Sequence, residues 1–230
     1  MDKFITWAQQ LNFDSVIQTA LIVCASLLCI TFHETCHGWA AYLLGDPTAK
    51  RQGRLTLNPL RHIDLVGLVM MAIVHFGWAK PVPVDMRNFK DPKAGMAITA
   101  LAGPLANVVL AYLAVVLYMA LAAVYYVTAA GWLTYVLTFL YCVQLISAGL
   151  AVFNIFPIPP LDGSKVLFAL LPARAYDTLM RYERYGMGLL AVLLLTNVLD
   201  APLTFLREGL LDFLTRGGSW AFDLTLRCLL

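Results

Sequence analysis

The sequence predicts an all-α integral membrane protein, a polytopic helical bundle with a small membrane-associated β element. Hydrophobic residues make up 60% of the 230 positions, charged residues only 13%, and the mean hydropathy is +0.75. A soluble domain of this length could not bury so much apolar surface. The apolar residues gather in runs of about 20 or more, the length that a membrane-spanning helix needs. A short polar and apolar alternation between two runs accounts for the β element.

Four stretches are long and apolar enough to be spanning helices, and they are expected near residues 15–44, 97–127, 132–153 and 187–206. A fifth stretch, 63–78, is shorter and contains Asp64, His75 and two glycines. It could be a span, a re-entrant segment or an interfacial loop. Residues 53–59 alternate polar and apolar side chains and end in Asn-Pro, which predicts a short strand and a turn.

The rest of the composition favours one domain and narrows the partners. No long polar, Gly/Ser-rich or repetitive stretch interrupts the chain, so residues 1–230 are expected to form a single membrane-embedded domain. Five cysteines, an odd number without a CxxC pair, predict no disulfide framework. The net charge of +2 comes from loops between apolar runs and gives no sign of a nucleic-acid partner. The first apolar run lacks a following cleavage site, so it is expected to remain in the protein.

The distribution of Lys and Arg indicates an orientation, because cytoplasmic loops carry an excess of them. If residues 63–78 do not cross the membrane, segments 45–98 and 154–186 share one side and hold 12 of the 16 Lys and Arg residues. If residues 63–78 do cross, the 16 Lys and Arg residues divide into 7 on one side of the membrane and 9 on the other, which is a much weaker bias. The non-crossing arrangement therefore predicts both termini outside the cell and the basic loops in the cytoplasm, for a multi-pass protein of the cell membrane.

Catalytic chemistry is indicated by His33-Glu34-Thr35-Cys36-His37, which lies inside the first apolar run. His33 and His37 are one helical turn apart and share a face, where two imidazoles can bind one zinc ion. Glu34 beside them can act as a general base toward water. The alternative is a pair of core histidines with hydrogen-bonded partners. Each ionisable residue at mid-membrane costs roughly 2.5–3.5 kcal/mol, however, and three within five positions favour the zinc site.

A catalytic zinc site usually has a third protein ligand. The residues with suitable chemistry are Asp64, His62, His75, Cys36, Asp162 and Asp200. Asp162 follows three prolines and opens a short helical segment, where it could equally be an N-cap. Membrane depth favours it as the ligand. His33 lies about 11 residues, or roughly 16 Å of helix, before the end of its run, and the non-crossing arrangement delivers Asp162 to that same side.

The sequence closely resembles the site-2 protease family of intramembrane zinc metalloproteases. The resemblance is carried by His33-Glu34-Thr35-Cys36-His37, by Ala102-Gly103-Pro104-Leu105-Ala106-Asn107 and by Asn154-Ile155-Phe156-Pro157-Ile158-Pro159-Pro160-Leu161-Asp162-Gly163. It implies a catalytic core at about residues 15–171, one Zn²⁺ held by His33, His37 and Asp162, and Glu34 as the catalytic base. It also implies hydrolysis of peptide bonds within or near the transmembrane segments of protein substrates in the lipid bilayer. No gap between the motif-bearing runs is long enough for a PDZ domain, so a short form of the family is expected.

Two asparagines are candidates for holding an unwound substrate backbone or a developing oxyanion, namely Asn107 and Asn154. Each could instead make an interhelical hydrogen bond, which is common for Asn in membranes. Edge pairing of a substrate with residues 54–58 is a further hypothesis. A transporter would also place His and acidic residues in the membrane, but it would usually show interrupted helices repeated in two halves, and the sequence has no such repeat. A relative without catalysis would be expected to lack Glu34 or a ligand.

Overall fold

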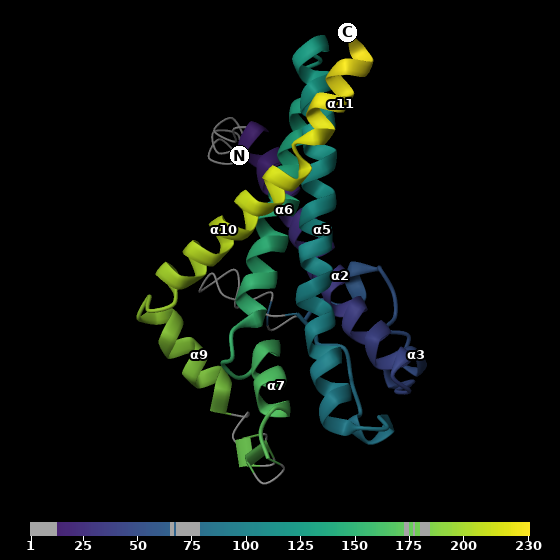
Figure 1. Cartoon of the computed structure of the whole chain (residues 1–230), viewed down its shortest axis with the longest axis vertical. Helices are drawn as coiled ribbons and strands as arrows, with labels where there is room; N and C mark the ends of the chain where they lie inside the picture. The colour runs from purple at the N-terminus through teal and green to yellow at the C-terminus, as the bar shows by residue number, and fades with distance from the viewer. Residues whose placement is uncertain (1–12, 65–66, 68–78, 173–174, 177, 180–184) are drawn as a thin grey trace, which may run out of the picture.

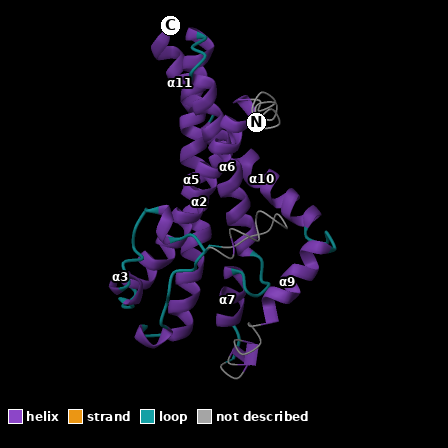
Figure 2. Ribbon diagram, turned by 180° about the vertical axis from the view of Figure 1, so that it is seen from behind, coloured by secondary structure: helices purple, strands orange, loops and turns teal. Residues whose placement is uncertain are grey.

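The computed structural model describes residues 13–64, 67, 79–172, 175–176, 178–179 and 185–230, to which every structural statement here refers. The described part is helical, with no strand (Figure 2). In chain order the helical elements are α2 Phe13–Leu43, α3 Thr48–Arg51, η1 Pro59–Arg61, η2 Met86–Asn88, α5 Pro92–Thr128, α6 Leu133–Ile155, α7 Asp162–Ala169, α9 Gly186–Leu195, α10 Asp200–Gly218 and α11 Trp220–Leu229.

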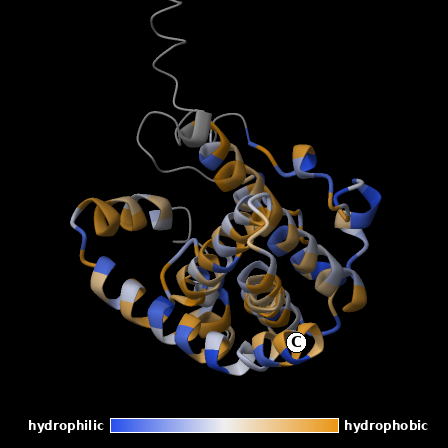
Figure 3. Cartoon of the chain, turned by 90° about the horizontal axis from the view of Figure 1, so that it is seen from above, coloured by the Kyte–Doolittle hydropathy of each residue, from blue (hydrophilic) through white to orange (hydrophobic). Residues whose placement is uncertain are grey.

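Three helices, α2, α5 and α6, are long and apolar enough to cross a membrane, which confirms the first three predicted spans. Large apolar side chains such as Ile22, Leu113 and Leu117 remain exposed on them. Seen from above, hydrophobic residues make up most of the central helices, as expected for helices in lipid (Figure 3). Helix α5 begins five residues before the predicted span, because Asp91 caps it by accepting from the backbone N–H groups of Lys93 and Ala94.

The three long helices pack through small residues. Ala25 and Cys29 of α2 are fully buried and meet Ala114 of α5 and Val143 of α6 in one apolar cluster. Small side chains at such contacts let helix backbones approach closely. Helix α2 runs antiparallel to α5 and parallel to α6, so the C-terminal ends of α2 and α6 and the N-terminal end of α5 lie at one end of the bundle (Figure 1).

The predicted span at 187–206 is not one straight helix. Helix α9 ends at Leu195, and residues 196–199 turn through Asn197 with φ of +56°. The helical segment Asp200–Leu229, which begins with α10, lies at 88° to α9. Leu190 and Leu199, on either side of the bend, pack with Leu161 after α6. The sequence analysis counted apolar residues and could not see this turn, which buries apolar side chains near α7. Asp200, one of the candidate ligands, is the exposed first residue of α10.

The predicted strand at residues 53–59 is wrong for this structure. The Thr56 carbonyl accepts hydrogen bonds from Thr35 Oγ1 at 2.9 Å and His62 Nε2 at 2.9 Å, so side chains occupy it and no strand pairs with it. Asn58 caps η1 by accepting from the backbone N–H of Leu60. The described β-type pairing is one isolated bridge between Ile63 and Ala79. Most of residues 63–78 lie outside the described residues. Whether this segment crosses the membrane therefore stays a prediction.

Buried Asp46 ties together the two loops at this end of the bundle. Its carboxylate accepts from Thr48 N at 3.0 Å and Thr48 Oγ1 at 2.5 Å in its own loop, and from Asp85 N at 2.7 Å and Asn88 Nδ2 at 2.7 Å across the gap. Burial alone would raise the pKa of Asp46, but these donors lower it below the ordinary Asp value. The ionised side chain therefore fixes the loop that begins at residue 79 against the end of α2.

Candidate metal centre

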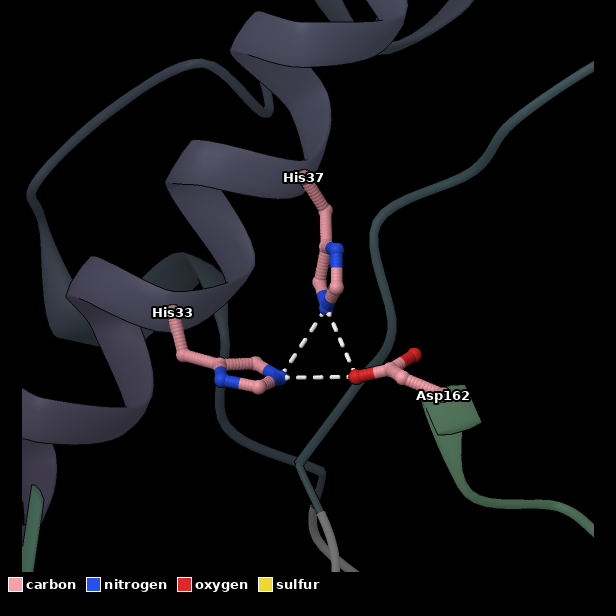
Figure 4. A group of neighbouring side chains, drawn as sticks. All are labelled: His33, His37 and Asp162. Atoms are coloured by element: carbon pink, nitrogen blue, oxygen red, sulfur yellow. Dashed lines mark hydrogen bonds and ion pairs between the residues drawn. The ribbon is translucent and has the colours of Figure 1, made fainter. Parts of the chain in front are cut away.

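Three side chains from two distant parts of the chain converge beside the C-terminal third of α2 (Figure 4). His33 Nε2 and His37 Nε2 are 2.9 Å apart, and Asp162 Oδ2 lies 3.2 Å from the first and 3.1 Å from the second. Both imidazoles are buried, with 6% and 8% of their residue surfaces exposed. The structure thus brings together the three residues that the sequence analysis selected, across 129 positions of chain.

Asp162 reaches the histidines because it is the first residue of α7, after the turn that ends α6. The N-cap position of α7 is occupied by Leu161, so Asp162 is not the N-cap that the alternative required. While Oδ2 faces the imidazoles, Oδ1 lies 4.0 Å from Lys165 Nζ. The Lys165 ammonium beside Oδ1 favours the ionised form of the Asp162 carboxyl. An ionised carboxylate is the form that a metal ligand requires.

The tautomer of His37 is fixed by a backbone carbonyl on α5. His37 Nδ1 lies 2.6 Å from Thr99 O, and since a carbonyl can only accept, Nδ1–H must be the donor. The neutral ring then presents the lone pair of Nε2 toward His33 and Asp162. Donation of the second ring N–H to a carbonyl is the usual way in which a metal-binding histidine is oriented.

The donor set fits a zinc ion. In a tetrahedral site with bonds of about 2.0–2.1 Å, ligand atoms are about 3.3 Å apart. The three separations here, 2.9–3.2 Å, are close to that edge length. Two imidazole nitrogens and one carboxylate oxygen leave a fourth position open, which is the arrangement of catalytic zinc sites. Among the described residues, this is the one group of three or more His, Cys, Asp or Glu side chains whose possible ligand atoms all lie within 4.8 Å of one another.

Glu34 lies beside the cluster and does not join it. Its Oε2 accepts a hydrogen bond from the backbone N–H of Val82 at 2.9 Å, which anchors the carboxylate from the loop opposite α2. Glu34, His33, His37 and Asp162 together line a polar cavity of about 320 Å³, with Lys165 at its wall. The carboxylate thus lines the same cavity as the three clustered side chains.

Gly103 on α5 makes the close approach of the two histidines possible. A Cβ atom built at this position would lie 2.7 Å from His33 Cε1 and would overlap the His37 ring. Any side chain here would displace the imidazoles. The sequence analysis treated Gly103 as a family motif position, whereas the structure shows the contact that excludes a larger residue.

A second cavity of about 290 Å³ shares His33, Glu34 and Asn154 with the first and is mostly apolar. Its apolar wall includes Leu27, Ile30, Leu150, Phe153, Leu161, Met187 and Leu190. Asn154 lines both cavities, and its Nδ2 donates to Leu150 O at 3.0 Å. Asn107 lines neither of these cavities: it is fully buried, and its backbone carbonyl accepts from Ser147 Oγ at 2.9 Å.

The other described candidate ligands do not join the cluster, although His62 and Asp64 line the second cavity beside it. His62 is buried and bonded to Thr56 O, and Asp64 accepts from the backbone N–H of Gly67 at 2.8 Å. Cys36 is half-buried and does not belong to the cluster. His75 lies outside the described residues. Thr99 and Val82 carry no signal in the sequence, because each contributes only a backbone group and no residue pattern marks such a role.

Comparisons with known proteins agree with this geometry. The sequence profile of "Peptidase family M50" matches residues 21–135 and 123–196. "Putative zinc metalloprotease YwhC" of Bacillus subtilis (strain 168) is 34% identical over 196 residues, which cover 85% of this chain and 86% of that protein. Two proteins called "Putative zinc metalloprotease Rip2", of Mycolicibacterium smegmatis and Mycobacterium tuberculosis, are 30% and 29% identical, and each alignment covers 78% of this chain and 68% of the relative. No solved structure matches the chain.

These matches define the class of the protein, a membrane protein of the zinc metalloprotease type. The chain belongs to Peptidase family M50, the site-2 protease family. No PDZ domain is evident in the part that the structure describes, as expected for a short form.

Proposed function

We propose that the chain is an intramembrane zinc metalloprotease that hydrolyses peptide bonds within or near transmembrane segments of membrane proteins. His33, His37 and Asp162 hold one zinc ion, and Glu34 is the general base. The observation that carries the proposal is the convergence of two imidazole nitrogens and a carboxylate oxygen at 2.9–3.2 Å, with a tethered glutamate beside them.

Zinc, when bound, supplies a Lewis acid that polarises the peptide carbonyl and acidifies water to a pKa of about 7. The chain supplies the proton transfers. Glu34 accepts the proton of the attacking water and returns it to the leaving amine, and general base catalysis of this kind contributes roughly 10²–10⁴-fold. Asn154, at the junction of the two cavities, is placed to bind an unwound substrate backbone or the developing oxyanion.

The substrate class follows from the surroundings of Glu34. The apolar cavity beside it suits a peptide segment rich in aliphatic or aromatic side chains. His33 is ten residues from the end of α2 at Leu43, roughly 15 Å of helix, so the site lies below the membrane surface. The basic loops at the same end of the bundle favour the cytoplasmic side of the cell membrane. Asn107, away from both cavities, is better placed to support helix packing than to contact substrate.

The test uses the full chain, purified in detergent with zinc, and a labelled single-span peptide of about 20 apolar residues with a central Asn-Pro as helix breaker. Wild type and the control Glu208→Gln, which changes an exposed glutamate on α10, should cleave the peptide equally. Glu34→Gln should retain zinc and lose about 10²–10⁴-fold in kcat. Cleavage by Glu34→Gln at the wild-type rate, or no cleavage by wild type, would contradict the proposed function.

A further inference from the structure

One peptide group joins a buried cation to the candidate catalytic base. The carbonyl of Pro81 and the N–H of Val82 belong to the same peptide unit. The carbonyl accepts from Arg54 Nη2 at 3.2 Å, and the N–H donates to Glu34 Oε2 at 2.9 Å. A guanidinium, a peptide and a carboxylate therefore form a continuous hydrogen-bonded chain.

Arg54 is held in place more firmly than a surface arginine. Only 7% of its surface is exposed, and the same Nη2 donates to the Lys80 carbonyl at 2.6 Å. Among the described residues no carboxylate forms an ion pair with Arg54. Burial of an unpaired charge is costly. The two backbone carbonyls that accept from Arg54, and the Glu34 carboxylate beyond the Pro81–Val82 peptide, must therefore compensate this cost.

The direction of the hydrogen bonds makes the chain cooperative. A cation at a carbonyl oxygen polarises the amide and makes its N–H a stronger donor, and in a low-dielectric site each bond strengthens the next. The acceptor at the far end is an anion when Glu34 is ready to act as a base. The geometry therefore connects Arg54 to the Glu34 carboxylate through one peptide group, without direct contact.

We propose that Arg54 is a positioning residue for Glu34, acting through the Pro81–Val82 peptide. The inference rests on the proposed function, since it gives Glu34 the role of base. It assigns the segment after residue 79 a part in catalysis, because that segment carries the effect of a cation from one side of the loop to the carboxylate on the other. A purely structural Arg54 would only hold the loop and would leave the Val82 to Glu34 bond unpolarised.

Selective isotope labelling makes the bond directly observable. The sequence contains two Pro-Val pairs, Pro81-Val82 and Pro83-Val84. Labelling proline with carbonyl ¹³C and valine with ¹⁵N gives an HNCO spectrum of the zinc-loaded full chain with two cross-peaks. The first reports both ends of the proposed relay, the Pro81 carbonyl and the Val82 amide proton, and the second is an internal control in the same loop.

The variants are Arg54→Gln, Arg54→Lys and Glu34→Gln, with exposed Arg51→Gln as the matched charge control. Glu34→Gln should shift the Val82 amide proton. Arg54→Gln should move the Pro81 carbonyl and shift the Val82 proton in the same direction as Glu34→Gln does, while the Pro83-Val84 peak stays in place. Arg54→Lys, which keeps the charge, should lie between Arg54→Gln and wild type. An unmoved Val82 proton in Arg54→Gln, or equal movement of both peaks as the loop collapses, overturns the proposal.

Kinetics on the single-span peptide supply the second readout. Arg54→Gln should lower kcat by about 10- to 100-fold, as expected for residues that orient a catalytic group, with KM and zinc content close to wild type. Arg54→Lys should recover part of the loss. Full activity of Arg54→Gln beside an inactive Glu34→Gln would overturn the positioning role alone, whereas full activity of both would overturn the proposed function.

Discussion

Gly103→Ala tests whether the close packing of α5 on the two histidines is needed for metal binding. A Cβ at this position would lie 2.7 Å from His33 Cε1 and closer still to the His37 ring. Ordinary van der Waals contact begins at 3.4 Å, so the His33 ring must retreat by about 0.7 Å. Zinc–nitrogen bonds tolerate only about 0.2 Å of change, so the ligand geometry cannot survive this shift intact.

The expected result is a loss of zinc affinity of about 10- to 100-fold, or roughly 1.4–2.7 kcal/mol, measured by competition with a chelator in detergent. The control is Gly149→Ala in α6, where a new Cβ would meet only Arg207 Cδ at 3.9 Å. Gly149→Ala should therefore bind zinc with the affinity of wild type. Wild-type zinc affinity in Gly103→Ala would refute the reasoning.

Three further predictions concern the loops and the ligand set. Asp46→Ala removes the buried carboxylate that accepts from the part-buried Asp85 N–H and from Asn88 Nδ2, and should cost about 1–3 kcal/mol, seen as a lower unfolding temperature than that of exposed Asp200→Ala. Folding lowers the pKa of Asp46, so its ionised carboxylate stabilises the folded protein fully above the unfolded-state pKa of about 4. This stabilisation is lost as the pH falls through the lower pKa of the folded state. The unfolding temperature of Asp46→Asn should therefore fall less on acidification than that of wild type. Cys36→Ser should keep zinc, and loss of zinc would show a sulfur ligand.

The helices that could be predicted from sequence are those whose apolar length alone defines them. Helices α2, α5 and α6 each contain more than 20 mostly apolar residues, and no competing structure satisfies such a backbone in lipid. The bend between α9 and α10 escaped prediction because composition carries no information on direction. It depends on Leu190 and Leu199 packing against Leu161, a tertiary contact.

The candidate site divides in the same way. Side-chain chemistry at helical spacing marks His33, Glu34 and His37, and motif and depth together mark Asp162, so their proximity could be predicted. The groups that orient them could not. The Thr99 carbonyl and the Val82 N–H are backbone atoms, and the bonds of Arg54 to the same loop go to the backbone carbonyls of Lys80 and Pro81. The alternation at residues 53–59 was misleading because the Thr56 carbonyl accepts from the side chains of Thr35 and His62 and not from a neighbouring strand.

Zinc held by His33, His37 and Asp162 is the premise of the catalytic proposal, and the zinc affinity of Asp162→Ala tests it most directly. Removing a ligand should exceed the effect of removing a supporting group, so the affinity should fall by roughly 100-fold or more relative to wild type. Asp200→Ala, the loss of an exposed carboxylate on α10, should bind zinc as wild type does. One zinc per chain at unchanged affinity in Asp162→Ala would contradict the assignment of this residue as the third ligand.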